Sequence, residues 1–299
     1  MDTDKAKSKV VVIVGPTASG KTSLSIKLAK DYQGEVISAD SRQVYRGMDL
    51  GTGKVTKEEM LDVPHHLIDV ADPMSVYTVA DFTHDGQIAI TAITNRGNLP
   101  IIAGGTFQYV DTLLGRMSTP AVPPNEELRA SLASEPIETL YARLTVLDPV
   151  RAATIDRQNP RRLIRAIEIA IALGHVPPTE SKERYSTLTL GISIDQATLH
   201  HNIHIRLAER LDAGMIAEVE RLLTGGVSHE RLNALGLEYR YISRYLHGLI
   251  DYDTMVKELE TKIRQFAKRQ YTWLKRDPSI IWVDPRDTGT IHKLVNNFL

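Results

Sequence analysis

The chain contains no cysteine in 299 residues. Structural disulfides and cysteine-ligated zinc sites are therefore excluded. The sequence also has no apolar run near the roughly 20 residues that cross a bilayer. The apolar run Val10–Val14 is shorter than the core of a signal peptide, which needs roughly 7 residues or more. We therefore expect a cytoplasmic protein without a membrane segment. We also expect a monomer.

An excess of charge of either sign is absent as well. Lys and Arg number 36 and Asp and Glu 37, so the formal net charge is −1. This balance argues against indiscriminate nucleic-acid binding through bulk charge, but it allows a local basic patch. With 42% hydrophobic and 24% charged residues, the composition is typical of a globular protein with room for one large α/β domain and a smaller companion.

Short apolar runs alternate with helical patterns along most of the chain. The runs that are typical of buried strands are Val10–Val14, Glu35–Ala39, His66–Val70, Leu99–Ala103, Thr187–Ile194 and Ser279–Val283. Helical patterns cover residues 21–30 and 79–95. This alternation predicts an α/β fold, a parallel sheet with helices on both faces.

The alternation stops at the proline-rich stretch Thr119–Pro124, which cannot continue a helix or a central strand. Residues 125 to about 174 then carry helical patterns only. We therefore predict a small all-helical insertion domain over residues 119–185. The predicted catalytic core comprises residues 1–118 and 186–299.

A phosphate-binding motif follows the first predicted strand. The pattern G-x-x-x-x-G-K-[ST] is filled by Gly15, Pro16, Thr17, Ala18, Ser19, Gly20, Lys21 and Thr22. Backbone N–H groups of such a loop surround a phosphate, and the N-terminus of the next helix adds a positive dipole end. Lys21 can reach the phosphates, and the Thr22 hydroxyl can bind Mg²⁺. The motif predicts a P-loop NTPase-like core with a polyphosphate ligand.

Asp40 follows the second predicted strand. Because the carboxyl ends of parallel strands line one crevice, Asp40 should face the mouth of the phosphate loop. A carboxylate there could bind a metal or act as a general base. The alternative is that Asp40 only caps a turn.

Many NTPases share the loop motif, so the motif alone does not identify a protein family. Further stretches of the sequence are more specific. They include Asp40–Lys54, His65–Asp69, Gly104–Thr106, Arg162–Glu168 and Ala267–Trp273. In this order, from residue 12 to about 276, the chain resembles the tRNA dimethylallyltransferase family, also called tRNA isopentenyl transferases. It departs from the family's usual residues at Phe107-Gln108 and at Leu237–Tyr239, near the expected substrate channel.

The resemblance implies transfer of a dimethylallyl group from dimethylallyl diphosphate to the N6 amine of an adenosine next to the anticodon in tRNA. Diphosphate would leave, held by the loop, Lys21, Mg²⁺ on Thr22, and Arg206. Asp40 would be the general base. The expected catalytic residues are thus Asp40, Thr22, Lys21 and Arg206. Thr106 and residues 40–43 would contact the flipped-out adenosine.

The predicted helix over Lys262–Arg276 is strongly basic, with six basic residues and no acidic one. A helical wheel predicts one apolar, core-packed arc comprising Ile263, Phe266, Ala267, Tyr271, Trp273 and Leu274. Basic residues flank this arc on both sides, as phosphate contacts would require. A merely solvated basic face is the alternative. The basic helix and the family resemblance together give the predicted tRNA contacts. They are Asp40, Ser41, Arg42, Gln43, Thr106, Arg129, Arg161, Arg162, Arg165, Arg264, Lys268 and Arg269.

Three other functions stay open. In an ATP-binding P-loop kinase, Asp40 would bind the acceptor and Arg161, Arg162 and Arg165 would be lid arginines. A prenyltransferase could instead modify free AMP, ADP or ATP, although such an acceptor needs neither the basic helix nor the insertion. A non-catalytic RNA-binding module would leave the phosphate loop and Asp40 unexplained.

Overall fold

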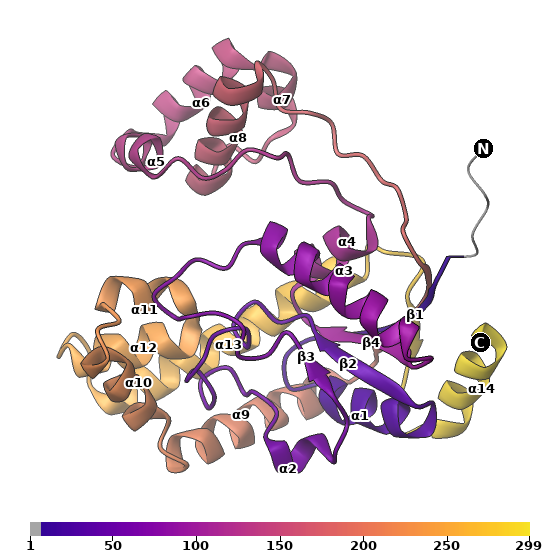
Figure 1. The fold of residues 1–299 in the computed structure, drawn as a ribbon. Coiled ribbons are helices and arrows are strands. Elements are labelled where there is room, and N and C mark those ends of the chain that lie inside the picture. The colour runs from indigo at the N-terminus through magenta and orange to yellow at the C-terminus, as the bar shows by residue number, and fades with distance from the viewer. Residues whose placement is uncertain (1–6) are drawn as a thin grey trace, which may run out of the picture. The chain divides into compact units, whose positions relative to one another are not determined.

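The computed structural model describes residues 7–299. Six strands form one parallel sheet in the order β3-β2-β4-β1-β5-β6. Figure 1 labels the first four strands of the chain within this sheet. Their bounds are β1 Lys9–Val14, β2 Gly34–Ser38, β3 His65–His66, β4 Leu99–Gly104, β5 Ser186–Ile192 and β6 Ile281–Val283. The predicted α/β fold with a parallel sheet is therefore confirmed.

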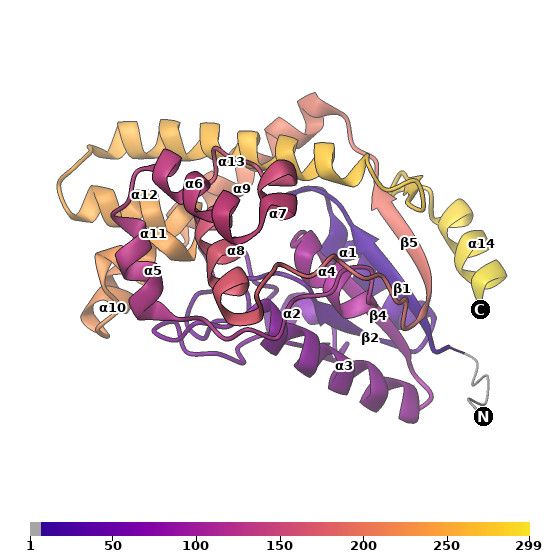
Figure 2. The ribbon, with the colours of Figure 1, turned by 90° about the horizontal axis from the view of Figure 1, so that it is seen from above.

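Helices cover both faces of the sheet, as predicted. Successive residues of a strand point to opposite faces, so Val10, Val12 and Val14 pack under α3 (Val79–Asn95) and α4 (Phe107–Leu114). Val11 and Ile13 pack against α1 (Lys21–Asp31) and α14 (Thr288–Phe298) on the other face. The two layers can be followed in Figure 1 and Figure 2.

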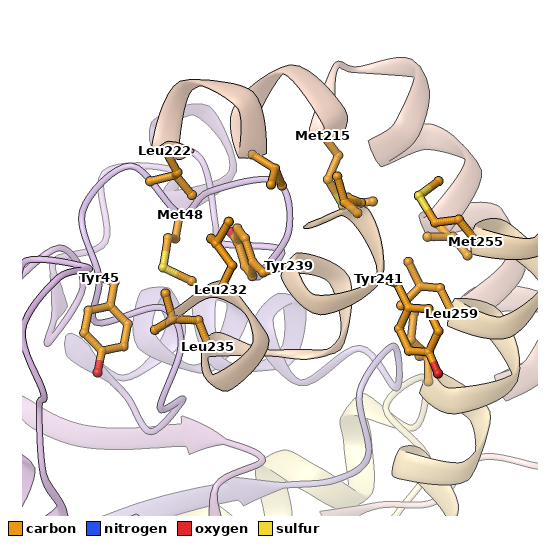
Figure 3. Packing of buried hydrophobic residues seen from close by; sticks show 14 of the residues in the cluster. Tyr45, Met48, Met215, Leu222, Leu232, Leu235, Tyr239, Tyr241, Met255 and Leu259 are labelled. Atoms are coloured by element: carbon orange, nitrogen blue, oxygen red, sulfur yellow. The ribbon is translucent and has the colours of Figure 1, made fainter. Parts of the chain in front are cut away.

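A second, wholly helical cluster follows β5. It contains α9 (Gln196–Asp212), α10 (Met215–Thr224), α11 (His229–Leu235), α12 (Leu237–Leu246) and α13 (Tyr252–Leu274). Figure 3 shows Tyr45 and Met48, from the segment after β2, among the buried side chains of these helices. This packing holds the segment in place, and only the last part of α13 was predicted from the sequence.

The predicted strand His66–Val70 is wrong beyond its first residue. β3 ends at His66, and Leu67 and Asp69 adopt left-handed φ angles of 61° and 58°. Such angles interrupt an extended strand. The backbone N–H of Asp69 instead donates to the carbonyl oxygen of Gln43, at 3.3 Å, so this stretch packs on the segment after β2.

The chain divides into two compact units. One consists of Met1–Gly115, described from residue 7 onward, and Glu183–Leu299; the other is Arg116–Lys182. The second unit contains α5 (Glu126–Ala133), α6 (Ile137–Leu147), α7 (Pro149–Thr154) and α8 (Pro160–Leu173), where helices alone were predicted. α6 and α8 share a core that includes Leu140, Leu144, Leu163 and Ile167. Among residues 7–299, no helix combines the length and apolarity needed to cross a membrane.

Candidate active site

Three loops meet at one edge of the sheet because they follow three adjacent parallel strands. β1, β4 and β2 are neighbours, and their last residues are in register: Val14 pairs with Gly104, and Ser38 pairs with Ala103. The loops that follow these strands contain the phosphate motif, Asp40 and Thr106. The strand ends therefore bring together residues that lie about 90 positions apart.

The phosphate loop is tightly packed and has an unusual backbone. A Cβ atom on Gly15 would lie 2.8 Å from Ser19 Oγ and 3.1 Å from Ile192 Cβ, so a larger residue there would displace one of these side chains. Gly20 has a φ angle of 94° at the start of α1, and Ala18 has a φ of 61°. A non-glycine residue in the left-handed region stores strain, which is typical of functional sites. The Asn202 amide of α9 donates to the Ala18 carbonyl oxygen at 3.2 Å.

The loop contains polar groups without an anionic partner. Lys21 Nζ donates to the Pro16 carbonyl oxygen at 2.7 Å. The buried Ser19 hydroxyl has no hydrogen-bond partner among residues 7–299. Burial, together with the nearby Arg206 charge, lowers the pKa of Lys21 to about 8, against the opposing effect of Asp40. Burial and the neighbouring Arg210 charge likewise lower the pKa of Arg206. Cations that are desolvated together in this way mark a place for an anion.

Asp40 is half-buried and close enough to Lys21 to raise its pKa. Its Oδ1 accepts the backbone N–H of Arg42 at 2.9 Å. The turn cap that the sequence left open is thus present. A carboxylate has further acceptor sites, so the cap leaves room for a second role.

The threonine after β4 is tied directly to the Asp40 segment. The Ser41 N–H donates to Thr106 Oγ1 at 3.0 Å, and the Thr106 N–H donates to the Ala39 carbonyl oxygen at 3.2 Å. A Cβ atom on Gly104 would lie only 2.1 Å from that same oxygen. The two loops therefore form one rigid edge.

Gln43 and the glycine-rich stretch beyond it are also anchored. Gln43 Oε1 accepts from Ser38 Oγ at 2.9 Å, and Nε2 donates to the Gly53 carbonyl oxygen at 3.2 Å. Gly53 is in turn covered by Arg210, whose Nη2 would lie 1.8 Å from an added Cβ. Arg210 lies next to the half-buried Glu238, at 3.9 Å, and burial raises the pKa of that carboxyl group. The sequence analysis assigned no role to Arg210 or Glu238.

A buried glutamate that the sequence analysis left without a role anchors the segment after β2. Glu218 is 2% exposed and accepts the backbone N–H groups of Asp49, Leu50 and Gly51 at 2.7–3.0 Å. It also accepts the Tyr239 hydroxyl at 2.7 Å. Tyr239 belongs to one of the two stretches that depart from the family pattern. The sequence signals for this anchor are a carboxylate on the apolar face of α10 and the match of Glu218 and Val219 to the family pattern.

The predicted apolar arc of α13 is partly wrong. The buried residues of its second half are Ile263, Ala267, Gln270 and Leu274. Phe266 and Trp273 are 41% and 42% exposed. The guanidinium groups of Arg269 and Arg276 lie over their rings, 5.9 and 5.6 Å from the centroids. The buried face includes a glutamine because its amide oxygen and its amide nitrogen each have a partner: Gln270 accepts the Thr17 N–H at 2.8 Å and donates to the Gly105 carbonyl oxygen at 3.1 Å.

The other basic residues of α13 have different surroundings. Arg264 forms an ion pair with Glu260, one turn earlier on the helix. Lys268 and Arg269 are exposed. The solvated basic part of the helix thus carries at least these two cations, and Arg264 is partly neutralised.

In the helical unit, two of the predicted tRNA contacts are bound to a buried carboxylate. Glu168, 2% exposed, pairs with Arg129 at 2.9 Å and with Arg165. Arg165 also donates to the Val122 carbonyl oxygen at 2.8 Å. Arg161 and Arg162 are exposed, with Asp156 at 3.7 Å from Arg162. The four arginines thus divide into two that are committed to the unit's own structure and two that face solvent.

The phosphate loop offers an oxygen ligand that is suited to a magnesium ion. No group of three or more His, Cys, Asp or Glu residues in the described part of the chain could hold a metal. Mg²⁺ does not need such a cluster, because it usually keeps several waters and binds through substrate phosphates and one or two protein oxygens. Thr22 is exposed in the first turn of α1, where its hydroxyl can supply one oxygen.

These features define an α/β protein whose P-loop-like sequence motif lies beside a carboxylate. The family model described as IPP transferase matches residues 43–277. A protein named tRNA dimethylallyltransferase from Thermomicrobium roseum is 41% identical over 295 residues, covering 96% of this chain and 90% of the relative. Its namesake from Exiguobacterium sp. is 44% identical, covering 93% and 91%. The chain therefore belongs to the IPP transferase family.

Solved structures agree with this assignment. The tRNA isopentenylpyrophosphate transferase of Bacillus halodurans has a TM-score of 0.75 and 36% identity, covering 98% of this chain and 97% of that protein. A eukaryotic dimethylallyltransferase acting on tRNA has a TM-score of 0.80 and 26% identity, covering 94% of this chain and 75% of the other.

Proposed function

We propose that this protein transfers a dimethylallyl group from dimethylallyl diphosphate to the N6 amine of an adenosine next to the anticodon in tRNA, releasing diphosphate. Membership of the IPP transferase family and the names of the relatives support this reaction. The observation that carries it is the pair of desolvated cations, Lys21 and Arg206, beside the Asp40 carboxylate. The two cations can hold a leaving anion, while the carboxylate can receive a proton.

The phosphate loop holds the diphosphate in this proposal, and ATP is not required. The loop N–H groups, Lys21 and Arg206 face the negative charge that grows on the leaving oxygen as its bond to the allylic carbon breaks. Thr22 would hold Mg²⁺, which neutralises phosphate charge when bound. The buried Ser19 hydroxyl, which has no hydrogen-bond partner in the described part of the chain, is a further donor for a phosphate oxygen.

Asp40 receives the proton that the adenine amine loses when its nitrogen bonds to the allylic carbon. An exocyclic amine of adenine is a poor nucleophile, so most of the acceleration must come from positioning and leaving-group stabilisation. The Arg42 N–H and the contact between Ser41 and Thr106 hold the Asp40 turn in place. Residues 40–43 and Thr106 are the proposed contacts to the extruded base.

The tRNA backbone would bind exposed cations of both units. Arg161 and Arg162 in the helical unit, and Lys268 and Arg269 on α13, have the exposure that phosphate contacts require. Arg129 and Arg165 shape the unit through Glu168, and Arg264 is shared with Glu260. Their predicted tRNA contacts would use guanidinium N–H groups left over from these pairs.

Acceptor and donor competition separates this proposal from its alternatives. The purified protein is incubated with labelled dimethylallyl diphosphate or labelled ATP, and with tRNA, AMP or a small-metabolite pool. We expect label in tRNA from dimethylallyl diphosphate only. Phosphoryl transfer from ATP would favour a kinase, and a preference for AMP would make the acceptor a free nucleotide. Light scattering of the same sample tests the expected monomer, and fractionation of cells tests the expected cytoplasmic location.

A further inference from the structure

Gln270 joins two loops of the candidate active site. Its side chain is 6% exposed on α13. The amide oxygen accepts the N–H of Thr17 in the phosphate loop at 2.8 Å, and the amide nitrogen donates to the carbonyl oxygen of Gly105 after β4 at 3.1 Å. Only a side chain with an acceptor and a donor at the same end can make both contacts.

The contact continues toward the proposed base. A Cβ atom on Gly105 would lie 2.4 Å from Gln270 Nε2, so the backbone there approaches the amide closely. The next residue, Thr106, accepts the Ser41 N–H at 3.0 Å, and Ser41 adjoins Asp40. Three hydrogen bonds, joined through the peptide bond between Gly105 and Thr106, thus connect the loop that would hold the leaving group to the segment that would hold the nucleophile.

We propose that Gln270 is a positioning residue, which fixes the separation between the phosphate loop and the Asp40 segment. The proposal rests on the proposed function, because it concerns the same transfer reaction. Gln270 itself touches neither reacting group. A displacement of about 1 Å between reacting groups can cost about 10²-fold in rate. The bond formed by the adenine nitrogen and the bond broken to diphosphate lie on the two sides that Gln270 joins.

The test compares Gln270→Met with Gln265→Met in single-turnover transfer to tRNA at saturating substrates. Methionine has a similar length but neither hydrogen-bonding group, and Gln265 is an exposed glutamine on the same helix. We expect the rate constant of Gln270→Met to fall about 30-fold or more, while Gln265→Met keeps the wild-type value. The affinities for tRNA and for inorganic diphosphate, measured by calorimetry, should change less than about threefold.

The single-turnover trace also separates positioning from folding. Its amplitude reports the folded, competent fraction, whereas its rate constant reports the geometry of that fraction. A lower amplitude with an unchanged rate constant overturns the proposal, as does a weaker affinity for diphosphate that accounts for the whole loss. A wild-type protein that transfers no dimethylallyl group would refute the proposed function, and the inference with it; an active wild type with an equally fast Gln270→Met would refute the inference alone.

A double-mutant cycle tests the contact itself. Gly105→Ala should slow the wild-type reaction about tenfold or more, because the new methyl group displaces the amide of Gln270. In a Gln270→Ala background the space is free, so the same substitution should slow the reaction less than about twofold. Equal slowing in both backgrounds would show that Gly105 and Gln270 act independently, and would overturn the proposed link.

Discussion

Raising the pH should switch off the Lys21 charge well below the pH expected for a lysine. Burial and the nearby Arg206 lower the pKa of Lys21 to about 8. If its ammonium group helps to hold diphosphate, kcat/KM for dimethylallyl diphosphate at saturating tRNA follows its protonated fraction. From the protonated fractions, we expect a plateau below about pH 7 and a loss of about tenfold between pH 7 and pH 9.

Lys21→Arg is the matched control, because a guanidinium group keeps its charge throughout this range. The variant should be slower at pH 7, since its larger group does not fit the lysine site. Its profile, however, should lack the alkaline decrease that the wild type shows. Dividing one profile by the other removes the titration of the substrates. A wild-type profile that stays flat to pH 9.5, or the same decrease in both proteins, would refute the role of the Lys21 charge.

Unfolding does not explain such a loss. The folded-state pKa of Lys21 lies below the unfolded value of 10.5, so burial penalises the charged form. That penalty is complete below pH 8 and disappears as the pH rises toward 10.5. The contribution of Lys21 to the stability of the free protein therefore increases through the window in which the activity falls. Denaturation measured at pH 7 and pH 9 tests the sign.

Three further predictions follow from the contacts described above. Asp40→Ala should lower kcat about 10²-fold or more without changing tRNA affinity, as initial rates and filter binding measure, and near-normal turnover would remove Asp40 from the base role. Glu218→Ala leaves three backbone N–H groups unpaired, that of Gly51 buried and those of Asp49 and Leu50 part-buried. It should lower the free energy of unfolding in urea by about 3–5 kcal/mol, against about 1 kcal/mol for Tyr239→Phe; similar losses in the two variants would contradict this. Replacing Lys268 and Arg269 with glutamine should weaken tRNA binding. The slope of the logarithm of the binding constant against the logarithm of salt concentration should fall by the equivalent of about one to two phosphate contacts. An unchanged slope would place α13 away from the RNA backbone.

The strands of the sheet and the position of the phosphate loop could be predicted from sequence periodicity and from the loop motif. Strand runs such as Val10–Val14 are buried on both faces, so their composition alone identifies them. The motif Gly15–Thr22 depends on local backbone geometry, which its glycines dictate. Asp40 could be placed near the loop because parallel strands end at one edge, whereas Thr106 was expected there only from the family resemblance. These are features that neighbours in sequence or the topology of the sheet determine.

The contacts that fix the site depend on residues far apart in the chain. The helical wheel placed Phe266 and Trp273 in the core, because it used hydrophobicity and could not see that the polar Gln270 finds partners in two loops. The role of Glu218 could not be predicted from its neighbours in sequence, because the N–H groups that it accepts belong to residues 49–51. The strand over 66–70 failed for a similar reason, since tertiary packing on Gln43 outweighed β-propensity.

Mass analysis of tRNA nucleosides tests the central claim most directly. Unmodified tRNA is incubated with the purified protein, Mg²⁺ and dimethylallyl diphosphate, then digested to nucleosides and compared with a reaction lacking the protein. The account predicts an adenosine that carries one dimethylallyl group on N6, located beside the anticodon, and an equal amount of released diphosphate. Unchanged adenosine in tRNA, with the protein folded and both substrates present, would contradict it.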